Sequence, residues 1–184
     1  MSRISSLTLE AASETVRSLL EGVLALGGGG RLLNLHLEMA NSPAVLASYL
    51  GLRQAVSGHG TLDRKTGAAI MLAVGQVDHS AYTLAVSTQV ALRAGWTAEE
   101  TVELRSGKTS DSKLGTLLAV VEQAAAGAGR VDDATWQAAQ AAGWSAPQLV
   151  EAFAYLGLAL YVDYFTNFVG TELDVPAAPA LSVR

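Results

Sequence analysis

Apolar residues recur at helical spacing along almost the whole chain, and the strict alternation that marks a half-buried strand is missing. Alanine and leucine far outnumber the β-branched residues that strands favour. Half of the residues are hydrophobic and only 16% are charged, so most helix faces need a partner to pack against. A length of 184 residues suits one ordinary domain. We therefore predict a single all-α domain over residues 1–184.

Capping residues and glycines divide this domain into about seven to nine helices. A four-glycine run at 27–30 predicts a flexible linker, and the proline-containing end, 177–184, predicts a C-terminal arm. The predicted helices cover residues 8–26, 44–58, 64–77, 81–94, 110–126, 132–142 and 149–170, with a further helix after the capping box that begins at Thr97.

A short pattern occurs twice along the chain. Gly-Trp-Thr-Ala at 95–98, followed by Val-Glu at 102–103, recurs as Gly-Trp-Ser-Ala at 143–146, followed by Val-Glu at 150–151. The offset between the copies is 48 residues (143 − 95). Similar turn chemistry explains such a pattern, and so does a duplicated helical hairpin. Both explanations stay open at the level of the sequence.

Charge and composition exclude several classes of function. The net charge of −5 and the scattered Lys and Arg residues predict no nucleic-acid partner. The chain has no cysteine, which excludes disulfides, thiolate metal sites and cysteine nucleophiles. The first residues lack the apolar run of a secretory signal, so we expect a cytoplasmic protein. Residues 149–170 are long enough to span a bilayer but include Glu151 and Asp163, which favours a buried helix and no membrane partner.

General motif searches find no catalytic or cofactor site. Gly107-Lys108-Thr109 ends like a phosphate-binding loop, but the glycine required five positions earlier is Val102. The histidines, His36, His59 and His79, show no metal-ligand spacing, and no Gly-x-Ser-x-Gly nucleophile turn is present. We predict neither a metal nor a cofactor.

Four segments together carry a family resemblance. Residues 60–66 (Gly-Thr-Leu-Asp-Arg-Lys-Thr) lead into the apolar run 69–74, and a polar turn then precedes Ser-Ala-Tyr-Thr at 80–83. The segments 93–100 and 142–176 follow in order. Over residues 42–176 the chain resembles the carboxymuconolactone decarboxylase and AhpD-like alkylhydroperoxidase superfamily. The resemblance implies an AhpD-like helical bundle that assembles as a dimer, trimer or hexamer.

The same resemblance implies a lost active site. Peroxidase members use a Glu, two Cys and a His, and the matching positions here are Ala68, Ser80, Thr83 and Ser87. None of these residues carries the required group. Peroxide reduction needs a thiolate, and a hydroxyl oxygen cannot cycle through sulfenic acid and disulfide. We therefore predict that thiol peroxidase activity is absent.

Cysteine-free members of the superfamily have a Ser-x-Tyr pattern with a retained His. Ser80 and Tyr82 match this pattern, but Ser87 replaces the His, so His79 becomes the candidate acid–base group. Simpler roles for these residues are a turn histidine and a packing tyrosine. Three functions remain open: an oligomeric scaffold that binds a small apolar molecule, a non-thiol decarboxylase- or hydrolase-like enzyme using His79, Tyr82 and Ser80, and a protein-interaction module.

A homo-oligomer is also expected on physical grounds. A 184-residue chain buries only about 70% of its surface on folding. Because half of this chain is hydrophobic, apolar helix faces should remain for contacts between subunits.

Overall fold

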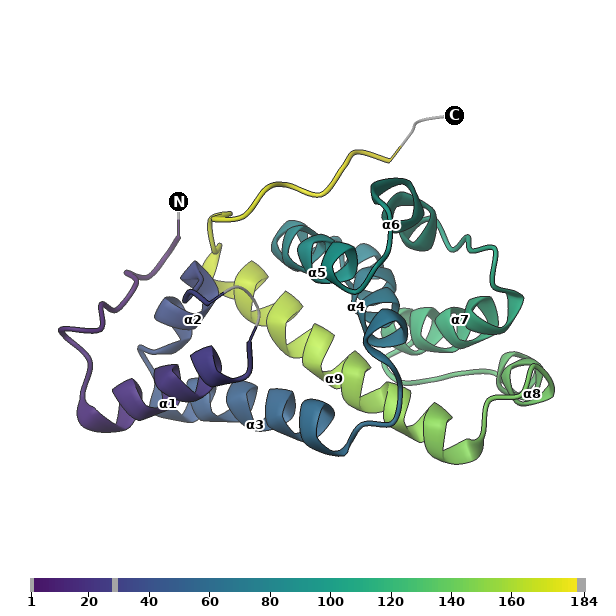
Figure 1. The fold of residues 1–184 in the computed structure, drawn as a ribbon, viewed down its shortest axis with the longest axis horizontal. Coiled ribbons are helices and arrows are strands. Elements are labelled where there is room, and N and C mark those ends of the chain that lie inside the picture. Colours follow the sequence, from purple (N-terminus) through teal and green to yellow (C-terminus); the bar gives the residue numbers. More distant parts are fainter. Residues whose placement is uncertain (1, 28–29, 182–184) are drawn as a thin grey trace.

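The computed structural model describes residues 2–27 and 30–181, and within them it contains nine helices and no strand. The helices confirm the predicted all-α, AhpD-like bundle (Figure 1). They are α1 (Glu14–Ala25), α2 (Asn34–Met39), α3 (Pro43–His59), α4 (Arg64–Val77), α5 (Ala81–Arg93), α6 (Ala98–Arg105), α7 (Ser112–Ala126), α8 (Asp133–Ala141) and α9 (Ala146–Val169).

Most predicted boundaries are confirmed within a few residues, because the cap residues act as expected. The Asp63 carboxylate accepts the Thr66 N–H at 2.7 Å, which starts α4. Thr97 starts α6 with a complete capping box. Gly95, after α5, has a φ of +94°, a left-handed conformation that glycine adopts readily.

Two predicted helix ends need correction, and one helix was missed. α1 begins at Glu14 and not near residue 8, because Ser13 provides the N-cap while Thr8 caps a separate turn. α3 continues through Gly58 to His59. The short helix α2 was not predicted; the backbone N–H of Leu33 donates to Nδ1 of His36 at 3.0 Å, so an imidazole replaces the usual oxygen acceptor at its start.

The predicted linker and arm are described only in part. Residues 28 and 29 lie outside the described residues, and the flanking Gly27 and Gly30 both have left-handed backbones. Residues 182–184 of the arm also lie outside them. The described part of the arm packs on the fold, since Ala178 contacts the core and the Pro179 carbonyl accepts from Arg105 at 2.6 Å.

The longest helix, α9, connects two hydrophobic clusters. Its Leu149, Ala152 and Leu156 pack into a cluster built mainly from α4 and α7, while Leu158 and Val162 pack into a second cluster from α1, α2 and α3. In Figure 1, α9 runs diagonally between the α1–α3 group and the α4–α8 group. Each cluster is therefore completed by a different set of α9 side chains.

The sequence repeat corresponds to repeated structure. The Trp96 indole N–H donates to the Lys65 carbonyl at 2.9 Å, and the Trp144 indole N–H donates to the Lys113 carbonyl at 2.8 Å. Each lysine ammonium also lies over its tryptophan ring, at 4.2 and 4.5 Å from the centroid. Both pairs keep the 48-residue offset (113 − 65 and 144 − 96). These matched contacts support a helical duplication rather than chance similarity of turns.

Candidate functional site

A cavity of about 500 Å³ lies where the resemblance places the family's active site. Ala68 from α4 and Thr83 and Ser87 from α5 all line it. α4 and α5 pack closely here, because Gly75 leaves room for the Thr83 side chain: an added Cβ would lie 3.0 Å from its Cγ2. Three of the four predicted positions therefore meet at one open cavity.

The fourth position, Ser80, does not line this cavity. It is fully buried at the N-cap of α5, where its hydroxyl accepts the Thr83 N–H at 3.3 Å. This bond is a cap interaction that fixes the start of the helix. Ser80 and Thr83 therefore lie one helical turn apart, as a Cys-x-x-Cys pair would, but the Ser80 hydroxyl is engaged in local structure.

A buried carboxyl group lies behind these two residues. Asp163 on α9 is completely buried, and neither of its oxygens has a hydrogen-bond partner among the described residues. The pKa of Asp163 is raised to about 7, chiefly by burial. The nearby Thr83 and Ser80 hydroxyls oppose this rise, and the neighbouring Asp78 carboxylate contributes to it. Burial likewise raises the pKa of Asp78. The two carboxyl groups form a pair in which Asp163 tends to keep a proton.

The two residues considered for residual chemistry lie away from the cavity. His79 is exposed in the turn after α4, with a left-handed φ of +52°, and it does not line the cavity. The Tyr82 hydroxyl accepts from the Leu35 N–H at 3.3 Å and donates to Asp174 at 2.8 Å. Burial raises the pKa of Tyr82 well above its ordinary value. Tyr82 thus anchors the segment after α9, and it does not meet His79 and Ser80 at a common site.

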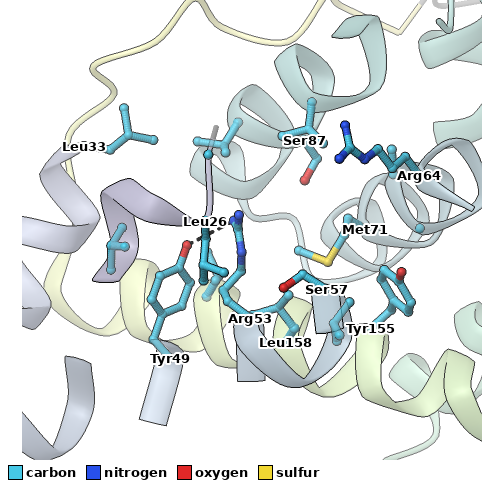
Figure 2. Close-up of a pocket in the computed structure, with 18 of the residues that line it drawn as sticks. Leu26, Leu33, Tyr49, Arg53, Ser57, Arg64, Met71, Ser87, Tyr155 and Leu158 are labelled. Carbon is cyan, nitrogen blue, oxygen red and sulfur yellow. Dashed lines mark hydrogen bonds between the residues drawn. The ribbon is translucent and has the colours of Figure 1, made fainter. Parts of the chain in front are cut away.

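The interior of the cavity is mostly apolar, whereas its polar lining is basic. Figure 2 shows Met71 and Leu158 beside the open space, with Arg53 from α3 and Arg64 from the start of α4 directed toward it. Arg31 also lines the cavity and is paired with Asp174 at 3.5 Å. Among the described lining residues there is no Asp or Glu. The cavity therefore combines an apolar interior with an excess of positive charge.

The Tyr49 hydroxyl is positioned to donate a hydrogen bond into the cavity. Nδ1 of His36 accepts from Leu33, so the imidazole proton is on Nε2, which lies 3.2 Å from the Tyr49 hydroxyl. Burial lowers the pKa of His36 to about 4, which keeps the ring neutral.

The Tyr49 oxygen therefore accepts from His36, and it also accepts from Arg53 at 3.4 Å (Figure 2). Burial raises the pKa of Tyr49, so the hydroxyl keeps its own proton. That proton has no acceptor among the described residues and remains available to a group in the cavity.

Sequence reasoning missed the residues that give the cavity its polarity. Tyr49 and Arg53 lie one turn apart on α3, but nothing in their local sequence indicates that α3 faces α4 and α5. In the sequence, Asp163 stands out only as a charged residue in an apolar helix. Its isolation in a buried helix was the available signal, since unpaired buried carboxyl groups are rare.

No described site gathers three or more His, Asp or Glu side chains as metal ligands. The arrangement instead offers hydrogen-bond donors and positive charge around an apolar space. By its fold, the protein is a helical bundle of the AhpD-like class. Both positions where the resemblance places the family's cysteines, Ser80 and Thr83, hold hydroxyl side chains.

Comparisons with known proteins agree with that class. The chain matches an uncharacterized peroxidase-related protein with an alkylhydroperoxidase AhpD core from Ralstonia eutropha JMP134, with a TM-score of 0.83, 14% identity, and 94% and 92% of the two chains covered. It also matches a variant of the debrominase Bmp8 in complex with 2,3,4-tribromopyrrole, with a TM-score of 0.80, 14% identity, and 95% and 94% coverage. At this identity the likeness shows the fold.

The sequence comparison matches the central part of the chain to one family. Residues 43–126, which include the five helices α3 to α7, match the model of the carboxymuconolactone decarboxylase family. This central segment is therefore similar to that family, and the chain as a whole has an AhpD-like fold. No curated protein matches the chain significantly.

Proposed function

We propose that this protein binds a small anion with a mostly apolar body in the cavity between α3, α4, α5 and α9, and that it does not reduce peroxides through thiols. The observation that carries this proposal is the pairing of an apolar interior with the Tyr49 hydroxyl and the Arg53 and Arg64 guanidinium groups. A carboxylate or similar head group would accept from these donors, while the rest of the ligand contacts Met71 and Leu158.

The charges of the lining support an anion over a cation. The Arg64 guanidinium makes no hydrogen bond or ion pair with any residue that the structure describes. The Arg53 guanidinium hydrogen-bonds only with the Tyr49 hydroxyl among these residues, and it lies 6.0 Å from the centre of that ring. A bound anion would therefore provide both arginines with the counter-charge that the cavity wall lacks.

The loss of thiols supports the second part of the proposal. Thr83 and Ser87 keep the cavity polar at the former reactive positions but supply no group that peroxide can oxidise reversibly. The debrominase Bmp8 has been solved with a small halogenated ring compound, so a related fold can hold such a molecule. Non-thiol catalysis by His79, Tyr82 and Ser80 has less support, because these side chains do not converge.

Ligands that share one apolar tail test the preference for an anion. We expect octanoate to bind more tightly than octanol or octylamine in calorimetric titrations at neutral pH. Removing one charge-assisted hydrogen bond costs about 1.5–3 kcal/mol, so Arg53→Met should weaken octanoate binding about tenfold or more. Arg130→Met removes an exposed arginine in the loop after α7 and should leave the affinity unchanged.

Two results would overturn this assignment of the ligand. One is equal affinity for octanoate and octylamine; the other is equal binding by the Arg53→Met and Arg130→Met proteins. The redox part is tested separately with cumene hydroperoxide and either dithiothreitol or dihydrolipoamide. We expect no consumption of hydroperoxide above a protein-free control, and clear turnover would contradict the proposal.

A further inference from the structure

A line of apolar residues is exposed along one face of α9. Val150, Phe153 and Tyr164 retain 65%, 66% and 62% of their surface, and Phe168 at the end of the helix retains 76%. Gly157 lies between them, and a Cβ added there would meet no atom within 4 Å. The face is open and runs for almost the full 24 residues of the helix.

The spacing along this face alternates between three and four residues, as in the contact positions of a coiled coil. We call this set the α9 stripe, and its members are Val150, Phe153, Gly157, Leu160, Tyr164 and Asn167. With 3.6 residues per turn, these positions fall within a narrow sector of the helix surface. The other sides of α9 are used by the two hydrophobic clusters, and within the stripe Leu160 is half-buried because it also packs against the first cluster.

The stripe is complementary to itself when it is reversed. Around a twofold axis between Leu158 and Ala159, Phe153 of one copy faces Tyr164 of the other. By the same symmetry Gly157 faces Leu160, so a small residue meets a large one at the centre. An aromatic pair would then lie on each side of this central contact.

Charge does not oppose such a pairing, although the whole chain has a net charge of −5. The only charged residues in α9 are Glu151 and Asp163. The Glu151 carboxylate accepts from the backbone N–H groups of Thr61 and Leu62, at 2.7 and 2.9 Å, and Asp163 is buried. Neither belongs to the stripe, so two copies would meet through uncharged surfaces.

The exposed area is sufficient for a specific interface. The exposed fractions of the stripe residues Val150, Phe153 and Tyr164, together with that of Phe168 beside the end of the stripe, correspond to about 500 Å² on each copy. Two copies would thus bury about 1,000 Å², which is near the lower limit for a specific protein–protein interface.

We propose that the α9 stripe pairs in an antiparallel, twofold manner with the α9 stripe of a second copy of this chain. This helix is also long and apolar enough to cross a membrane by length and composition. A second copy explains the stripe better, because a lipid surface requires neither the central glycine nor the reversed match of large and small residues. The proposal uses the outer face of α9 and does not depend on the ligand in the cavity.

Because the chain has no cysteine, introduced thiols can test the register directly. In an antiparallel pair, position 153 of one copy lies beside position 164 of the other, whereas the two 153 positions are about 16 Å apart along the helix. We expect the Phe153→Cys/Tyr164→Cys protein to form a covalent dimer on mild oxidation. The single Phe153→Cys protein should stay uncross-linked; cross-linking of the single variant alone would indicate a parallel pair and overturn the proposal.

Light scattering of the unmodified protein provides an independent measurement. We expect a mass of about twice 19.0 kDa, or a larger even multiple built from the same pairs. Phe153→Glu should produce monomers, whereas Leu92→Glu, at an exposed leucine on α5, should leave the assembly intact. A monomeric unmodified protein would overturn the proposal, and so would binding to phosphatidylcholine vesicles in place of self-association.

Discussion

Replacing Asp163 with asparagine should remove a specific pH dependence of stability. In the native protein the pKa of Asp163 is raised from 3.8 to about 7, chiefly by burial. Between these two values the unfolded chain ionises while the folded protein keeps its proton. The stabilisation from the neutral carboxyl is therefore complete below pH 3.8 and is lost as the pH rises toward 7.

The size of the effect follows from the shift. Between pH 5 and pH 8 the free energy of unfolding of the wild type should fall by about 3 kcal/mol relative to Asp163→Asn, at 1.36 kcal/mol per pKa unit. His36 titrates in the opposite sense: its pKa is lowered to about 4, so its contribution to stability rises with pH up to about 6.5. This contribution is common to both proteins and cancels in the difference.

Urea unfolding at pH 5 and pH 8 measures the difference between the two proteins. Asp133→Asn, at an exposed carboxyl on α8, is the matched control and should keep the wild-type pH dependence. The reasoning is wrong if Asp163→Asn and the wild type lose the same stability between the two pH values. That result would mean that the Asp163 carboxyl ionises freely in the folded protein.

Three further variants test the packing around the site. Introducing cysteines together at Ser80 and Thr83 should create a reversible dithiol, counted by thiol titration before and after reduction; no change in thiol number would contradict the inferred geometry. Tyr82→Phe should lower stability by about 1–2 kcal/mol in urea and speed proteolysis after α9, without changing octanoate affinity. Gly67→Ala places a Cβ 2.4 Å from the Tyr155 ring and should cost about 1–3 kcal/mol, so an unchanged melting temperature would contradict that contact.

Much of the fold could be predicted because the chain marks its helices with local signals. The bounds of α4 follow from the Asp63 cap and the apolar run after it, and the turn after α5 follows from Gly95. The helix α2 was missed because its first N–H is capped by the His36 ring, an acceptor that sequence rules for helix starts do not include. Helix boundaries could therefore be predicted where the common cap residues mark them.

The site was predictable only in part. The resemblance placed Ala68, Thr83 and Ser87 together, and the structure brings all three to one cavity. The donors Tyr49 and Arg53 belong to a different helix, so their arrival at that cavity depends on tertiary packing that no short motif encodes. The absence of cysteine from the sequence is enough to exclude thiol chemistry. The residues that line the cavity can be identified only from the folded structure.

A crystal structure of the protein with octanoate would test the central claim most directly. The account predicts that the carboxylate lies within hydrogen-bonding distance of the Tyr49 hydroxyl and the Arg53 guanidinium, with the alkyl chain along Met71 and Leu158. Octanoate bound elsewhere, or bound in the cavity with its carboxylate directed away from Tyr49 and Arg53, would contradict it.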